Sequence, residues 1–172
     1  MNRFPSDGCV AVKDCNLQIA DDRVPAIGEI GFAGTSAADS ISGTVGGLSA
    51  QRVRVGAGAE WRPSQVANIA WEDLVFDDGA TILLSPDANG MVPSIAVQGK
   101  AMLGDTLVYR LERNGNRLKT GSGTLISAVG GVVGDPEFVR GDATPKGLSF
   151  SVENAEALLF KYMPPGILLL VK

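Results

Sequence analysis

The sequence contains no histidine at all. This absence excludes Ser-His-Asp and Cys-His catalysis, metal sites with histidine ligands, and the side chain that most often moves protons near neutral pH. Carboxylates, lysine or tyrosine could still support catalysis, but the lack of histidine argues against an active site. We therefore expect a protein that is not an enzyme and that holds no cofactor.

Cysteine is nearly absent as well, because Cys9 and Cys15 are the only two in the 172 residues. Two thiols without histidine do not complete a tetrahedral zinc site, so we expect no metal. Free thiols in a reducing compartment are the simplest interpretation. A local disulfide that closes a small N-terminal loop is the alternative.

Long hydrophobic runs are missing. The longest, residues 167–171, is far shorter than the roughly 20 residues needed to cross a bilayer. Residues 5–8 are Pro-Ser-Asp-Gly and interrupt the N-terminus where a signal peptide would need an apolar segment. These absences predict a protein that does not enter a membrane and stays in the cytoplasm in which it is made.

Aromatic residues make up only 6% of the chain, whereas 22 glycines and 9 prolines supply many turns. Short runs rich in Val, Ile and Thr lie between these turns, which is typical of β-strands. No internal repeat, heptad pattern or low-complexity tract is recognisable. The chain is therefore expected to form one all-β domain over residues 1–172, a β-sandwich or a β-barrel.

Residues 105–128 are expected to form a long central hairpin. Asn114-Gly115 is the strongest short-range hairpin signal, because a type I′ turn needs positive φ at both central residues. In the resulting register Glu112 faces Arg117, which is an opposite-charge pair across the two arms.

The rest of the pattern predicts further strands and one or two short helices. Apolar and polar side chains alternate, as in half-buried strands, at residues 16–20, 52–55, 95–97 and 148–152. Pro63 suits the first turn of a helix that ends near Ala70, and Asn154 suits the cap of a helical turn within residues 155–162. Residues 86–90 read as a turn, and residues 167–171 as a buried strand. Trp61 and Trp71 are expected to be core or interface anchors.

The candidate functional residues are six basic side chains that could contact a neighbouring subunit. Two lie on the polar side of one strand and four surround the expected hairpin turn; they are Arg52, Arg54, Arg110, Arg113, Arg117 and Lys119. A solvated hairpin tip is the alternative interpretation of the second group. The net charge of −4 argues against a general nucleic-acid binder. It fits a contact in which the acidic N-terminal half of another copy meets these cations.

Three other kinds of site fail on their spacing. The glycines at residues 43–47 and 56–58 lack the further residues of a phosphate-binding loop. Asp77-Asp78-Gly79 begins like a calcium loop, but the later oxygen ligands are missing. Five carboxylates have the residue type needed for glycoside hydrolysis, although no spacing selects two of them: Glu60, Glu72, Asp73, Glu112 and Glu137.

Residues 114–127, with Asn114-Gly115 followed by Gly121 and Gly123, resemble the hairpin of bacteriophage tail-tube proteins and their contractile-injection relatives. The resemblance implies a β-sandwich or barrel that joins its neighbours edge to edge in a ring. It also implies an acidic lumen through which DNA passes.

On this resemblance we expect a structural subunit of a phage particle, a tail-tube or neck-ring component. Such a subunit would be made in the host cytoplasm and would form a homo-oligomer in contact with other virion proteins. A capsid decoration or head-completion protein is the alternative within this class. A small β-barrel that binds a ligand or saccharide is the alternative from another class, and a histidine-free carboxylate hydrolase is the third.

Overall fold

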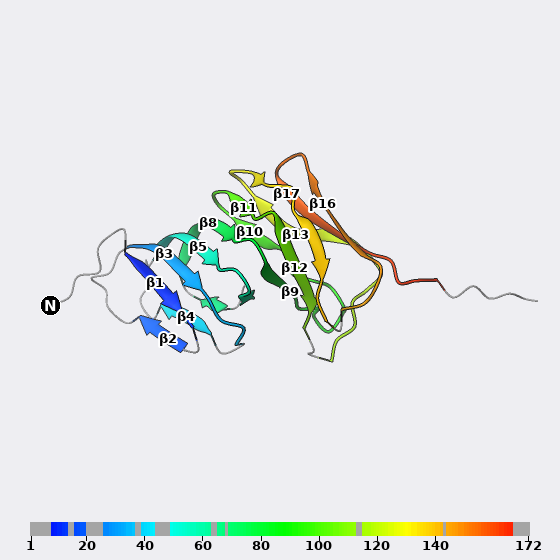
Figure 1. Ribbon diagram of the computed structural model, residues 1–172, viewed down its shortest axis with the longest axis horizontal. Coiled ribbons are helices and arrows are strands. Elements are labelled where there is room, and N and C mark those ends of the chain that lie inside the picture. The colour runs from blue at the N-terminus through cyan, green and yellow to red at the C-terminus, as the bar shows by residue number, and fades with distance from the viewer. Residues whose placement is uncertain are drawn as a thin grey trace, which may run out of the picture.

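The protein is seen in a computed structural model, which describes residues 8–13, 16–19, 26–36, 39–43, 49–62, 65–67, 69–112, 115–142 and 144–166. These residues are built almost entirely from β-strands (Figure 1). The chain winds into stacked coils, and strands of successive coils pair side by side in parallel. The architecture is a β-solenoid, whose coils follow one another from the blue N-terminal end to the orange C-terminal end of Figure 1.

The long sheet takes one strand from each coil, in the order β1-β3-β5-β8-β11-β14. Every pair in it is parallel, so each return of the chain to this sheet completes one coil. Its strands are β1 (Cys9–Val12), β3 (Ala26–Phe32), β5 (Ser49–Val55), β8 (Ala70–Phe76), β11 (Ala101–Leu103) and β14 (Val132–Val133).

Three smaller sheets form the other sides of the coils. The short sheet is parallel and contains β2 (Asn16–Ile19), β4 (Ser40–Gly43) and β7 (Val66–Ala67). The side sheet is parallel and contains, in order, β15 (Glu137–Arg140), β12 (Thr106–Leu111), β9 (Ala80–Leu84) and β6 (Glu60–Trp61). The C-terminal sheet contains, in order, β10 (Ile95–Val97), β13 (Gly121–Ala128), β17 (Ala157–Tyr162) and β16 (Leu148–Glu153).

Parallel stacking aligns inward-facing apolar side chains into columns along the solenoid. One column of the long sheet is buried, fully so at its four central members, and consists of Val10, Ile30, Val53, Leu74, Ala101 and Val132. Its successive members are 20, 23, 21, 27 and 31 residues apart in the sequence. Neighbouring residues on each strand point outward, because side chains alternate along a strand. The core is thus a stack of coils and not a layer between two sheets.

Two loops stack at the corner between the side sheet and the C-terminal sheet, residues 85–94 and 115–120. The Lys119 amide donates a hydrogen bond of 2.9 Å to the Gly90 carbonyl. Gly90 has a φ of 78°, and a Cβ atom there would lie 2.5 Å from the Arg117 carbonyl oxygen. Glycine is therefore required where one loop passes the other.

Among the described strands, β17 is the one that breaks the parallel order, because it runs antiparallel to both β13 and β16. The turn between β16 and β17 has positive φ at Asn154 (51°) and Ala155 (54°). The Glu156 amide closes it with a hydrogen bond of 3.0 Å to the Glu153 carbonyl. This is the geometry of a type I′ hairpin, and it places an antiparallel ribbon at the C-terminal end of the solenoid.

The expected β-sandwich or β-barrel is wrong, although the all-β composition is confirmed. A sandwich or barrel built from hairpins joins strands that are neighbours in the sequence. Here most partners belong to successive coils, at separations such as that of Val53 and Leu74. Stacking every coil on the previous one buries apolar side chains in continuous columns, which two-stranded hairpins do not provide.

The expected central hairpin over residues 105–128 is also wrong. β12 pairs in parallel with β9 and β15, whereas β13 lies in another sheet against β10 and β17. Gly115 has a φ of 84°, as the turn pattern requires, but Asn114 lies outside the described residues. The chain turns a corner of the coil at this place and does not fold back on itself.

Neither expected α-helix is found among the described residues, apart from a single 3-10 turn in which the Gln65 amide donates to the Arg62 carbonyl at 3.0 Å. Val66 and Ala67 form β7 where the helix after Pro63 was expected, and Pro63 itself lies outside the described residues. Asn154 begins the hairpin turn and β17 follows it, because pairing with β13 and β16 on both sides favours the strand. No helix in the described part of the chain is long and apolar enough to span a membrane.

Several local predictions are confirmed. Strands occupy residues 16–19, 49–55, 95–97 and 148–153, with Val53 and Val55 fully buried and Arg52 and Arg54 exposed. The strand at 16–19 lacks the expected half-burial, because Leu17 is exposed. The turn at residues 86–90 forms, with Asp87 accepting hydrogen bonds of 2.8 Å from the amides of Asn89 and Met91. Residues 167–171 and Cys15 lie outside the described residues, and Cys9 is exposed.

Candidate functional site

The site begins with outward-facing residues near the ends of three neighbouring strands of the side sheet. Trp61 lies opposite Ile82, and Ile82 lies opposite Tyr109, and all three side chains are buried. Alternation along the strands then turns the residues on either side of them outward. Five polar residues gather there and are called the corner cluster: Glu60, Arg62, Ser85, Arg110 and Glu112.

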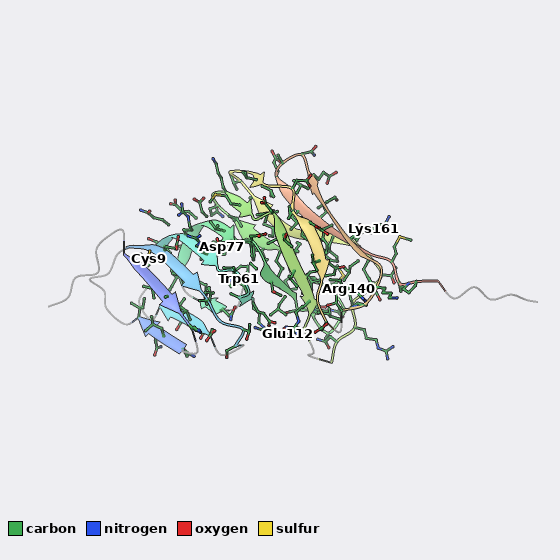
Figure 2. The ribbon with its side chains drawn as sticks, viewed as in Figure 1. Cys9, Trp61, Asp77, Glu112, Arg140 and Lys161 are labelled. Atoms are coloured by element: carbon green, nitrogen blue, oxygen red, sulfur yellow. The ribbon has the colours of Figure 1, made fainter. Side chains whose placement is uncertain are left out.

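Two ion pairs cross the corner cluster, and each joins residues 50 positions apart. Arg110 Nη1 donates to Glu60 Oε1, and Arg62 Nε donates to Glu112 Oε1 at 2.8 Å. Both pairs reach over β9, whose Leu83 is 6% exposed beneath them. Figure 2 shows Trp61 inside the stack of coils and Glu112 at its lower edge.

Glu112 is held as a carboxylate. Ser85 Oγ donates to its Oε2 at 2.5 Å, and this hydrogen bond is the largest cause that lowers the pKa of Glu112. The hydrogen bond and the positive charge of Arg62 lower the pKa further, against the opposing effect of burial. A general acid for glycoside hydrolysis needs a raised pKa, so this environment is the opposite of the one required.

The structure brings two of the five candidate carboxylates together. Glu60 and Glu112 line one pocket, and each is paired with an arginine. Asp73 lies on the long sheet, where it accepts a hydrogen bond of 2.8 Å from the Lys100 amide. Glu137 lies on β15. Both glutamates of the pocket are thus engaged by guanidinium groups, and the arrangement can bind hydrogen-bonding groups.

Two pockets share Arg62 and Leu83 in their walls. The polar pocket has a volume of about 340 Å³ and is lined by Glu60, Arg62, Leu83, Arg110, Leu111, Glu112 and Asp142. The apolar pocket has a volume of about 180 Å³ and is lined by Arg62, Leu83, Ser85, Val92, Pro93, Ile95 and Leu125. A polar and an apolar cavity thus lie next to each other at this corner.

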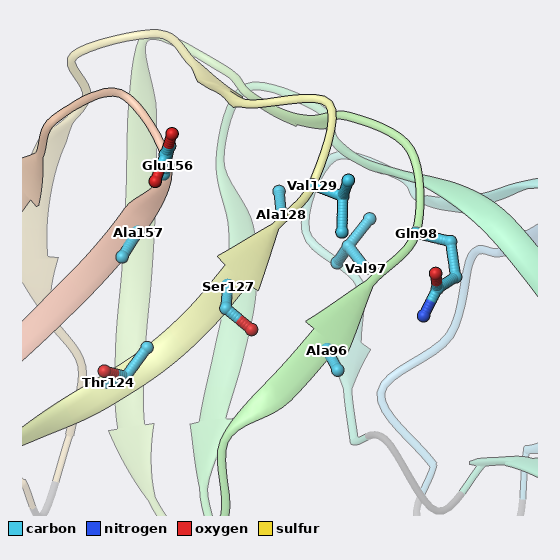
Figure 3. A pocket seen from close by; sticks show the side chains of 9 residues that line it. All are labelled: Ala96, Val97, Gln98, Thr124, Ser127, Ala128, Val129, Glu156 and Ala157. Carbon is cyan, nitrogen blue, oxygen red and sulfur yellow. The ribbon is translucent and has the colours of Figure 1, made fainter.

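A larger and shallower hollow of about 450 Å³ lies on the outer face of the C-terminal sheet (Figure 3). Its floor is a row of small side chains on three paired strands, Ala96, Ser127 and Ala157. Figure 3 shows Glu156 on one side of this row and Gln98 on the other. The floor offers little that would select a ligand, because it presents a single hydroxyl between two methyl groups.

The six basic residues expected at an interface are not gathered at one place. Three of them pair with carboxylates of the same chain: Arg52 with Glu29 at 3.4 Å, Arg54 with Asp77 at 2.9 Å, and Arg110 with Glu60. Arg117 and Lys119 are exposed in a corner loop, and neither forms an ion pair within the described residues. Arg113 lies outside the described residues.

The acidic turn that resembled the start of a calcium loop has structural partners. Asp77 forms an ion pair with Arg54 at 2.9 Å. Asp78 Oδ1 accepts a hydrogen bond of 2.7 Å from the Thr106 amide of the next coil. No group of three or more metal-binding side chains occurs within the described residues. Trp61 is buried as expected, edge-on to Trp71 at 6.2 Å between ring centroids, so it is not a platform for a ligand.

Sequence reasoning missed Arg62, which links the two pockets. A signal was present: Glu60-Trp61-Arg62 and Arg110-Leu111-Glu112 carry charges of opposite order around an apolar residue. Such triplets complement each other when their strands run parallel in one sheet. Searches with the sequence and with the structure matched no protein-family model, no curated protein and no solved structure.

Proposed function

We propose that the chain is a non-enzymatic structural subunit that joins neighbouring molecules through the edge strands of its last coil. β14, β15 and β16 each end the order of their sheet, so one side of each strand has no strand partner within the described residues. On β14 that side is partly occupied, because the Val132 amide donates a hydrogen bond of 2.6 Å to the Ala155 carbonyl. Unpaired strand edges bind further strands readily. Assembly would turn this aggregation hazard into a specific contact.

The observation that carries the proposal is exposed apolar surface on these edges. Val133 on β14 is 52% exposed and Val139 on β15 is 40% exposed. Beside them Phe138 stacks on Phe150 at 4.5 Å between ring centroids, and both rings remain only partly buried. A neighbouring molecule seated on this end would bury these side chains.

The setting that we propose is a phage particle, and its support is the sequence pattern of residues 114–127 alone, because the hairpin expected from that pattern does not form. The resemblance implied a tail-tube ring built from a β-sandwich or β-barrel, and this chain forms neither of these folds. We therefore propose a decoration or head-completion component, in contact with other virion proteins, in place of a tube subunit. Virion genes on both sides of the coding sequence would support this setting, and metabolic genes there would contradict it.

The assembly itself is tested by light scattering of the purified chain over a range of concentrations. We expect oligomers that grow with concentration and that are lost in Val133→Lys with Val139→Lys, because lysine on an edge strand opposes pairing. Val129→Lys is the matched control, since Val129 is 81% exposed but lies in a turn. A wild-type chain that stays monomeric at every concentration contradicts the proposal.

A further inference from the structure

The corner cluster contains a buried guanidinium nitrogen that has no hydrogen-bond partner within the described residues. Arg62 donates through Nε to Glu112, which fixes the plane of the guanidinium group. Its Nη1 is buried and has no hydrogen-bond partner, and Nη2 forms no hydrogen bond within the described residues. Leaving a donor unsatisfied at a partly buried position is unfavourable, so a ligand that accepts a hydrogen bond from Arg62 meets a preformed partner.

The charges of the polar pocket favour a neutral ligand. Three carboxylates, Glu60, Glu112 and Asp142, line the pocket together with the two guanidinium groups of Arg62 and Arg110. The slight excess of negative charge disfavours phosphate and other anions, and the arginines disfavour cations. Carboxylates accept hydrogen bonds and arginines donate them, so a hydroxyl group, which does both, fits the pocket best.

The apolar pocket adds a second requirement. Val92, Pro93, Ile95 and Leu125 surround a space next to Arg62 that suits a small hydrocarbon group. A carbonyl that accepts from Arg62 while an attached methyl group fills this space is an acetamide. The ligand therefore needs several hydroxyl groups and one acetamido group.

We propose that the corner cluster binds a neutral N-acetylated sugar, with its hydroxyls on the carboxylates and its acetyl methyl in the apolar pocket. The ring lies over Leu83 between Arg62 and Arg110, which border the polar pocket. The two pockets together have the size of an ordinary small-molecule site. Asp142 follows the edge strand β15 directly, so the polar pocket borders the proposed assembly surface. Arg62 and Val92 lie outside the edge strands of the last coil, and substitutions there separate sugar binding from assembly.

The test uses N-acetylglucosamine as the probe and glucose as its match without the acetamide. In saturation-transfer NMR we expect the acetyl methyl protons to receive the strongest signal, with a dissociation constant in the millimolar range. Val92→Phe fills the apolar pocket and Arg62→Lys keeps the charge beside Glu112 but removes the planar donors. Each should weaken binding about tenfold or more.

Val129→Phe is the control, because it changes an exposed valine that borders the other hollow (Figure 3). Its dissociation constant should equal that of the wild type. Equal binding of glucose, displacement of the sugar by inorganic phosphate, or absence of any saturation signal overturns the proposal. If circular dichroism shows that Val92→Phe is unfolded, the result for Arg62→Lys decides, and unchanged binding there overturns the proposal as well.

Discussion

Ala155 adopts a left-handed backbone conformation, with a φ of 54°, in the turn between β16 and β17. This conformation brings Cβ close to the carbonyl oxygen and costs about 1–2 kcal/mol for alanine. Ala155→Gly should therefore raise the free energy of unfolding by roughly 1 kcal/mol, less the entropy that glycine adds to the unfolded chain. Urea denaturation measures the difference.

Ala157→Gly is the control for Ala155→Gly, because Ala157 lies two residues further in the strand β17. Glycine there should lower the free energy of unfolding by about 0.5–1 kcal/mol. Equal effects of the two substitutions would show that the turn conformation of Ala155 carries no strain.

Glu112 makes stability depend on pH in the acid range. Its pKa in the folded protein lies below the ordinary value of 4.5, so the unfolded chain binds its proton first as the pH falls. The stabilisation is complete above 4.5 and is lost as the pH falls through the lowered pKa. Glu112→Gln should remove this part of the pH dependence. Urea titrations at neutral and acid pH measure it, and parallel curves for both proteins contradict the assignment.

The residue types in the sequence predicted only part of the chemistry of the candidate site. The sequence alone excludes histidine-dependent chemistry, because that depends only on composition. It also predicts the burial of Trp61, because indole side chains usually prefer buried positions. The pairing of Arg62 with Glu112 could not, since it requires three strands of the side sheet to be in register. A site built across coils is invisible until the coil length is known.

Truncating a side chain should destabilise the protein more in the buried column of the long sheet than at the exposed edge of that sheet. Leu74 is fully buried between Val53 and Ala101, so Leu74→Ala should lower the free energy of unfolding by about 2–5 kcal/mol. Val133→Ala, in the exposed edge strand β14, should change it by less than about 0.5 kcal/mol. Midpoints of urea denaturation measure both changes, and similar effects would contradict a continuous column.

Strands were predictable as elements, but their partners were not. Alternation identified β5, β10 and β16 because it depends only on neighbouring residues. Asn114-Gly115 suggested a hairpin, yet the type I′ hairpin forms at Asn154 and Ala155, where the sequence pattern is weaker. Each strand pairs where its apolar side chains extend a buried column of the previous coil. This depends on several coils together and not on neighbouring residues alone.

The whole molecule is a repeat that lacks a fixed period. Its coils are between 20 and 31 residues long at the column of the long sheet, so a search for one spacing finds nothing. The column residues also differ from valine to leucine and alanine, which removes any sequence signature. The all-β class followed from composition, whereas the solenoid needed the register.

Charge reversal in a corner loop tests whether the cations there contact another molecule. Arg117→Glu with Lys119→Glu should reduce the oligomers seen by light scattering and leave the circular dichroism spectrum unchanged, because both residues are exposed. Lys13→Glu with Lys100→Glu changes the net charge equally at two exposed positions outside the edge strands of the last coil. Equal losses in both variants indicate an effect of net charge and contradict a specific contact.

The unequal coil lengths indicate where the sequence can accept insertions during evolution. The extra residues of the longer coils collect in the corner loops, such as residues 85–94, and leave the buried columns aligned. Insertions at that corner would lengthen an outer loop without shifting any strand. The corner that carries the arginine pockets is therefore also the place where new recognition surfaces can be grafted onto an unchanged scaffold.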